Sequence, residues 1–149
     1  MNVIDLLGQE EGFKSKAYHC TQGYPTIGIG WRIGRRNQPL SDFEHMVISR
    51  PAAEGQLQYE VFAIEQELGN HDWFTKLNEA RQAVIVSMAY QMGISGLMKF
   101  QRMIAAIKEN DWCTAADEGL DSRWAKQTPE RANRQMKTLL CGDWSWYEV

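Results

Sequence analysis

The fold is decided by a stretch between residues 10 and 30, EEGFKSKAYHCTQGYPTIGIG, where an acidic helix end passes into a segment rich in glycine. From Phe13 to Ile33, β-branched and aromatic residues alternate with glycines, a pattern typical of short strands joined by tight turns. The pair Gln22-Gly23 indicates one of these turns. We therefore predict a small antiparallel sheet near the N-terminus.

A short helix is predicted directly before this sheet. Apolar residues recur at near-helical spacing over residues 3–11, Asn2 is a suitable N-cap, and Gly12 is a natural stop. We expect this helix to pack near the C-terminal part of the chain.

The rest of the chain has helical periodicity. Ser41 is a candidate cap for a short helix, and Pro51 opens a helix over 51–68 that ends at Gly69-Asn70. Further helices are predicted at 78–91, 96–108, 111–120 and 129–140. The expected architecture is α+β: one domain over 1–149, with a sheet lobe of about 12–50 and a helical lobe of about 70–149 joined by the long helix.

Composition narrows the function classes. The chain has 149 residues, 44% of them hydrophobic, enough for one domain with a core. No apolar run approaches the roughly 18 residues of a membrane span, and the N-terminal segment does not resemble an export signal. The three cysteines, Cys20, Cys113 and Cys141, have neither disulfide-scaffold nor zinc-finger spacing.

The net charge of −3 does not favour nucleic-acid binding. Acidity is concentrated between residues 41 and 80, which hold eight acidic and two basic side chains. We interpret this segment as a solvated helical face.

Glu11 is a candidate general acid. It stands at the predicted C-terminal end of helix 3–11, where the helix dipole disfavours negative charge, and a group that protonates a leaving oxygen needs such surroundings. The alternative is a solvated helix-end acid like its neighbour Glu10.

Cys20 and Thr26 are candidate partners of that acid. A thiol and a hydroxyl facing one cleft could hold a water on the side of a substrate opposite the acid, as an inverting glycosidase requires. Alternatively, Cys20 is a small buried hydrophobe and Thr26 an ordinary strand residue.

In combination, these residues resemble the bacteriophage lysozymes of the T-even type, also called endolysins. The spacing of Glu11, eight residues, Cys20, five residues and Thr26 is similar to that family's catalytic pattern. Later family landmarks follow in the same order: Ala89-Tyr90-Gln91-Met92-Gly93, Ser122-Arg123-Trp124, Thr128-Pro129 with Arg131, and Gly142-Asp143-Trp144. Nearly the whole chain is covered, most weakly over about 35–75.

The resemblance implies a lysozyme-like fold and a muramidase. Such an enzyme hydrolyses the β-1,4 bond between N-acetylmuramic acid and N-acetylglucosamine with inversion, using neither cofactor nor metal. Glu11 would be the acid, Cys20 the second catalytic group and Thr26 a residue that places the water, while Arg131 would hold the acid. The implied substrate-binding residues are Tyr90, Gln91 and Gly30; packing is the alternative for Tyr90 and Gln91, and turn geometry for Gly30.

Three positions depart from the family pattern. Cys20 replaces the commoner aspartate, Trp31 a usual histidine, and Gln22 a common glutamate. A thiol is mostly neutral at pH 7 and is a weaker base than a carboxylate, although related endolysins also carry cysteine at this position.

The resemblance also implies partners and a location. Peptidoglycan would be the substrate of a monomer made in the host cytoplasm, with no stable membrane insertion, and a holin would give it access to the wall. Two other functions remain open: a catalytically impaired glycan-binding module that keeps the fold, and a chitin or chitosan hydrolase.

Overall fold

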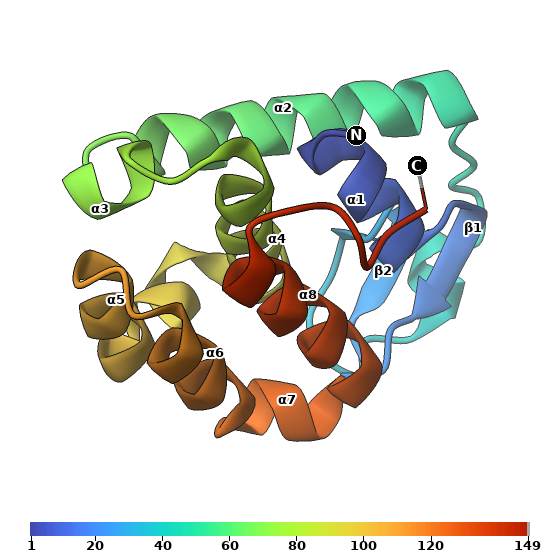
Figure 1. The fold of residues 1–149 in the computed structure, drawn as a ribbon. Helices are drawn as coiled ribbons and strands as arrows, with labels where there is room; N and C mark the ends of the chain where they lie inside the picture. Colours follow the sequence, from blue (N-terminus) through green and yellow to red (C-terminus); the bar gives the residue numbers. More distant parts are fainter. Residues whose placement is uncertain (149) are drawn as a thin grey trace.

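A computed structural model describes residues 1–148. A small three-stranded sheet lies on one side of the molecule, and most of the helices lie on the other (Figure 1). The first part of the chain forms α1 (Val3–Glu11), β1 (Lys14–His19), β2 (Pro25–Gly28), β3 (Trp31–Arg32) and a 3-10 helix, η1 (Leu40–Phe43). The helices α2 (Arg50–Leu68), α3 (Asp72–Thr75), α4 (Glu79–Met98), α5 (Gln101–Lys108), α6 (Trp112–Leu120), α7 (Arg123–Gln127) and α8 (Pro129–Cys141) follow. The predicted α+β, lysozyme-like class is confirmed.

Helix α1 has the predicted bounds because both of its ends are capped locally. The Asn2 side chain accepts a hydrogen bond from the Asp5 N–H, and the Asp5 carboxylate accepts one from the Asn2 N–H. Gly12 ends the helix at φ 65°, a conformation that favours glycine. Leu6 and Leu7 are fully buried, and α1 packs against α4.

The sheet is antiparallel in the order β1-β2-β3. Thr26 lies on the central strand, opposite Tyr18 on β1 and Arg32 on β3. Side chains of directly opposite residues share one face of a sheet, so Tyr18, Thr26 and Arg32 point to the same side. That side faces the cavity described below.

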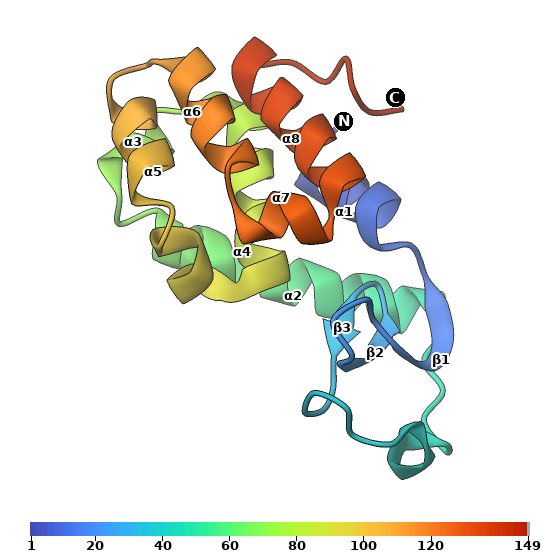
Figure 2. The same cartoon turned by 90° about the horizontal axis from the view of Figure 1, so that it is seen from below.

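Helix α2 connects the sheet to the remaining helices (Figure 2). The Ser49 hydroxyl accepts a hydrogen bond from the Ala52 N–H, and Pro51 occupies the first turn, where its missing N–H has no cost. One face of α2 packs against the core: Leu57, Val61 and Leu68 are buried, and Ile64 is partly buried. The prediction of a long helix in this segment is confirmed, and it begins one residue earlier than expected.

Several predicted boundaries were wrong. The helical backbone breaks at Gly93 (φ 81°, ψ 161°), as predicted for the end of helix 78–91, so α4 consists of two helical segments. The helix predicted over 96–108 is instead divided: its first residues belong to the second segment of α4, which ends at Met98, and the rest form α5 from Gln101. Ser41 is inside η1, whose N-cap is Pro39. The short helices α3 and α7 were not predicted, since four or five residues carry too little periodicity.

The core is built mainly from the helices. Its fully buried large side chains are Leu6, Leu7, Ile27, Leu57, Leu68, Ile85, Met88, Leu97, Met103, Ile107, Met136 and Leu139.

Among residues 1–148, no single helix has both the length and the apolar character to cross a membrane; α4 and α5 meet those criteria only as a pair bent by 96°.

Candidate active site

A cavity of about 470 Å³ lies between α1 and the sheet on one side and the helices on the other. Every site residue that the sequence predicted lines it: Glu11, Cys20, Thr26, Gly30, Tyr90, Gln91 and Arg131. These residues come from α1, the sheet and its turns, α4 and α8. The fold therefore gathers segments that are far apart in the chain around one space.

Arg131 fixes the Glu11 carboxyl group. Its Nη1 lies 2.6 Å from Glu11 Oε1, and its Nη2 donates a 2.9 Å hydrogen bond to the Ser87 hydroxyl. The Arg131 side chain is only 10% exposed. Gln135 also donates to the Ser87 hydroxyl, at 2.7 Å, so α8 and α4 together hold the guanidinium that meets the acid.

Gly30 packs against the other side of the Glu11 carboxyl group. It adopts φ 69°, and a methyl group added there would lie 2.6 Å from Glu11 Oε2, well inside the ordinary contact distance. Glycine is therefore required at this position both by the backbone and by the close approach of the acid. The Glu11 carboxyl is confined between a guanidinium and a peptide backbone.

Cys20 and Thr26 are linked through one carbonyl group. The Tyr24 carbonyl accepts a 3.0 Å hydrogen bond from the Cys20 N–H and a 2.8 Å hydrogen bond from the Thr26 hydroxyl. Cys20 lies in the turn that follows β1 and not in a strand. The sequence analysis had placed it within the predicted sheet. Because the Thr26 proton is already donated, its oxygen is left as an acceptor towards the cavity.

Tyr18 stands beside this group. Burial raises the pKa of the Tyr18 phenol above its ordinary value, and the negative charges of Glu11 and of an ionised Cys20 raise the pKa further. Tyr18 therefore carries a neutral hydroxyl on the cavity wall at neutral pH. Sequence analysis did not select it, and its position opposite Thr26 is the feature that could have identified it.

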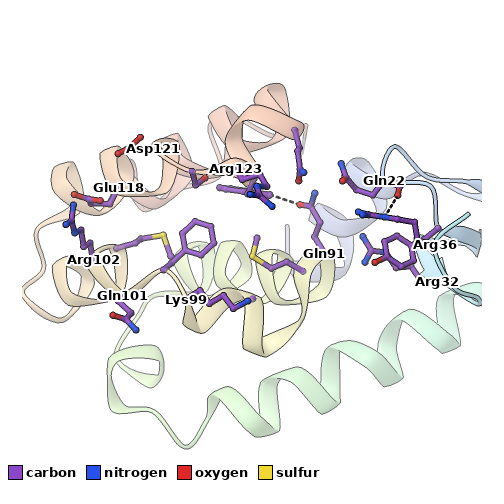
Figure 3. Close-up of a pocket in the computed structure, with 18 residues that line it drawn as sticks. Gln22, Arg32, Arg36, Gln91, Lys99, Gln101, Arg102, Glu118, Asp121 and Arg123 are labelled. Atoms are coloured by element: carbon purple, nitrogen blue, oxygen red, sulfur yellow. Dashed lines mark hydrogen bonds between the residues drawn. The ribbon is translucent and has the colours of Figure 1, made fainter.

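Tyr90 and Gln91 both have partners within the protein. The Tyr90 hydroxyl donates a 2.5 Å hydrogen bond to the Ile29 carbonyl, joining α4 to the turn before β3. The Gln91 Oε1 atom accepts a 2.8 Å hydrogen bond from Trp124 Nε1, drawn as a dashed line in Figure 3. These contacts are consistent with the packing alternative and leave the faces of both side chains on the cavity wall.

The environment of Glu10 differs from the prediction. It was taken as a solvated helix-end acid, yet its side chain is only 2% exposed. Arg134 binds it in a bidentate manner, with Nε at 2.8 Å and Nη2 at 3.1 Å, and Arg131 Nε lies 3.6 Å away. Glu10, Glu11 and two arginines of α8 thus form one partly buried ionic network. Its Glu10–Arg134 contact joins residues 124 positions apart.

The site follows the phage lysozyme pattern, and comparison with known proteins decides the family. Residues 8–140 match the family described as phage lysozyme. The chain belongs to the phage lysozyme family. Lysozymes are glycoside hydrolases that act on peptidoglycan, and the Glu11–Arg131 pair of this lysozyme-family protein lies in the cavity described above.

Individual relatives agree with this assignment. The chain is 31% identical to the pre-baseplate central spike protein Gp5 of Enterobacteria phage T4, over its whole length and 29% of that protein. It is 29% identical to the probable T4-type lysozyme 1 of Dictyostelium discoideum, covering 99% of this chain and 98% of the relative. It is 28% identical to the peptidoglycan hydrolase gp36 of Pseudomonas phage phiKMV, covering 89% of this chain and 14% of that protein.

Proposed function

We propose that the protein is an endolysin muramidase that hydrolyses the β-1,4 bond between N-acetylmuramic acid and N-acetylglucosamine in peptidoglycan, with inversion at the anomeric carbon. The observation that carries the proposal is the Glu11 carboxyl group, held 2.6 Å from Arg131 in a cavity also lined by Cys20 and Thr26. One side of the cavity offers a proton donor and the other offers groups that can hold a water.

The proposed reaction has one displacement step. Protonated Glu11 donates its proton to the glycosidic oxygen as the bond from that oxygen to the anomeric carbon breaks. A water molecule attacks the anomeric carbon from the opposite face, with one of its protons accepted in a hydrogen bond by Thr26. The attacking water releases its other proton to solvent, or to Cys20 when that side chain is a thiolate, as the new bond forms.

The remaining residues hold this geometry. Arg131 fixes the acid, and Gly30 allows the sheet to approach it. Tyr90 and Gln91 present an aromatic face and an amide to the sugar rings. Because catalysis depends on keeping the reacting groups in place, each of these residues affects turnover without touching the reacting atoms.

The first test compares the unmodified protein with Glu11→Gln on outer-membrane-permeabilised Gram-negative cells. We expect turbidity to fall only with the unmodified protein. Glu54→Gln, the same change at an exposed position of α2, is the matched control and should clear cells normally. Circular dichroism establishes that all three proteins are folded; clearing by folded Glu11→Gln would remove Glu11 as the acid.

The role of Cys20 is tested separately. If its side chain accepts a proton from the water, Cys20→Ser should be slower than the unmodified protein and Cys20→Asp should be active. Equal rates for the three forms would remove Cys20 from the mechanism. Proton NMR of the first product formed gives the anomeric configuration, and a retained configuration would contradict inversion.

The glycan-binding alternative is favoured by one observation, the thiol at the position where the family usually has a carboxylate. In that case the unmodified protein binds glycan without clearing cells, and Cys20→Asp, which restores the carboxylate, should gain clearing activity. A chitin or chitosan hydrolase would instead cleave chitosan oligomers and leave peptidoglycan intact.

The proposal extends to how the protein reaches its substrate. As the family implies, a monomeric enzyme would act from the host cytoplasm after a holin permeabilises the membrane. Expression in bacteria with and without a holin tests this step: lysis should require both proteins. Lysis of intact cells by this protein alone would contradict it.

A further inference from the structure

A second cavity of about 790 Å³ adjoins the candidate active site. Gln22, Arg32, Gln91 and Gln127 line both cavities, so a long substrate in one would extend into the other. In Figure 3, Gln22, Arg32 and Arg36 come from the sheet side, while Lys99, Arg102 and Arg123 come from the helices.

The wall of this cavity is cationic in a protein of net charge −3. The charged residues on its wall are Arg32, Arg36, Lys99, Arg102, Arg123, Glu118 and Asp121. Within residues 1–148, none of the five cations lies within ion-pair distance of a carboxylate. Both carboxylates are on the helical side, so the positive charge of the sheet side is not neutralised locally. A cleft lined by one sign of charge concentrates ligands of the other sign.

Two of these cations are held in fixed positions. The guanidinium carbons of Arg32 and Arg36 lie 4.3 Å and 5.3 Å from the centre of the Tyr24 ring, which is within the range of a cation–π interaction. Arg36 Nε also donates a 3.0 Å hydrogen bond to the Gln22 carbonyl. Among the described residues, the other guanidinium N–H groups of Arg32 and Arg36 have no hydrogen-bond acceptor.

We propose that Arg32 and Arg36, supported by Tyr24, form a subsite for the free carboxylates of the peptides attached to the glycan. The subsite would select anionic, peptide-bearing glycan over neutral glycan. A planar guanidinium matches a carboxylate in a two-point contact, and ring stacking reduces the freedom that each arginine loses on binding. Because Arg32 also lines the catalytic cavity, the ligand belongs to the same substrate molecule. The inference rests on the proposed muramidase function and specifies its substrate class.

The test compares two forms of one substrate, soluble glycan fragments that carry stem peptides. In one form the peptide carboxylates are free, and in the other they have been converted to neutral carboxamides. The unmodified protein should favour the free form by about tenfold in kcat/KM, mainly through KM, as expected for a few charge-assisted hydrogen bonds. This preference should decrease as salt is raised.

The variant is Arg32→Gln with Arg36→Gln, and the matched control is Arg35→Gln, an exposed arginine next to Arg36 that does not line the cavity. The double variant should lose the preference, so that its kcat/KM on the free form becomes equal to its kcat/KM on the carboxamide form. The control should keep the preference. Equal losses on both forms, or no preference in the unmodified protein, would overturn the subsite.

Binding to both fragment forms is measured in parallel with the Glu11→Gln protein, by calorimetry. This arm does not need turnover, so it separates the two proposals. If the unmodified protein cleaves neither form, the muramidase proposal fails, and the binding preference and its loss on changing Arg32 and Arg36 still decide whether the subsite exists. Equal affinity for the two forms rejects it.

Discussion

Replacing Gly30 with alanine should reduce turnover much more than it reduces stability. The added methyl group would lie 2.6 Å from Glu11 Oε2, whereas ordinary contacts begin near 3.4 Å, so the carboxyl group must move by about 0.8 Å. A displacement of about 1 Å at a reacting group can lower a rate by about 10². We therefore expect kcat to fall by about two orders of magnitude.

The same substitution also strains the backbone. Gly30 has φ 69°, and a residue with a Cβ atom is less stable there by about 1–2 kcal/mol. Gly93→Ala is the matched control, because Gly93 has φ 81° and no atom within 4 Å of an added methyl group. It should lose a similar free energy of unfolding in urea without the large loss of kcat.

Release of soluble muropeptides from purified peptidoglycan gives kcat for both variants, and urea denaturation gives their stability. If the argument is correct, Gly30→Ala and Gly93→Ala have similar free energies of unfolding and very different rates. Rates within about threefold of each other, less than 1 kcal/mol in activation free energy, would show that the position of Glu11 is not set by contact with residue 30.

Three further changes test the packing and the ionic network. Arg131→Gln leaves the Glu11 carboxylate without its cation and should lower the free energy of unfolding by about 3–5 kcal/mol; a loss below 1 kcal/mol in urea would mean that the pair is not effectively buried. Burial raises the pKa of Tyr90, so its contribution to stability is complete below the ordinary tyrosine pKa of about 10 and is lost as the pH rises above it. Tyr90→Phe should therefore flatten the alkaline fall in stability, and an unchanged pH dependence would contradict this assignment. Leu6→Ala, at a fully buried position, should cost about 2–5 kcal/mol, whereas Leu120→Ala, at a position 39% exposed, should cost much less.

Sequence analysis succeeded where the determinants are local. The Asn2 cap, the Gly12 stop and Pro51 in the first turn of α2 act on residues within four positions, so a single stretch of sequence contains them. The break at Gly93 was predicted because glycine interrupts a helix locally, whereas the break at Lys99-Phe100 was missed because no glycine or proline marks it.

The site was predictable only in part for the same reason. Glu11, Cys20 and Thr26 lie within sixteen residues in a recognisable pattern, whereas the burial of Glu10 depends on Arg134, 124 positions away. From the local sequence, Glu10 is indistinguishable from a solvated acid at a helix end, because only the packing of α8 shows that it is buried. Contacts of this kind are fixed by topology and leave no periodicity in the sequence.

The long separation between Glu11 and Arg131 has a consequence for biosynthesis. The ribosome makes Arg131 120 residues after Glu11, which takes on the order of ten seconds at typical translation rates. During that interval the acid lacks the cation that holds it, and α1 lacks the helices that bury it. The ion pair of the candidate active site therefore forms only once translation has reached α8.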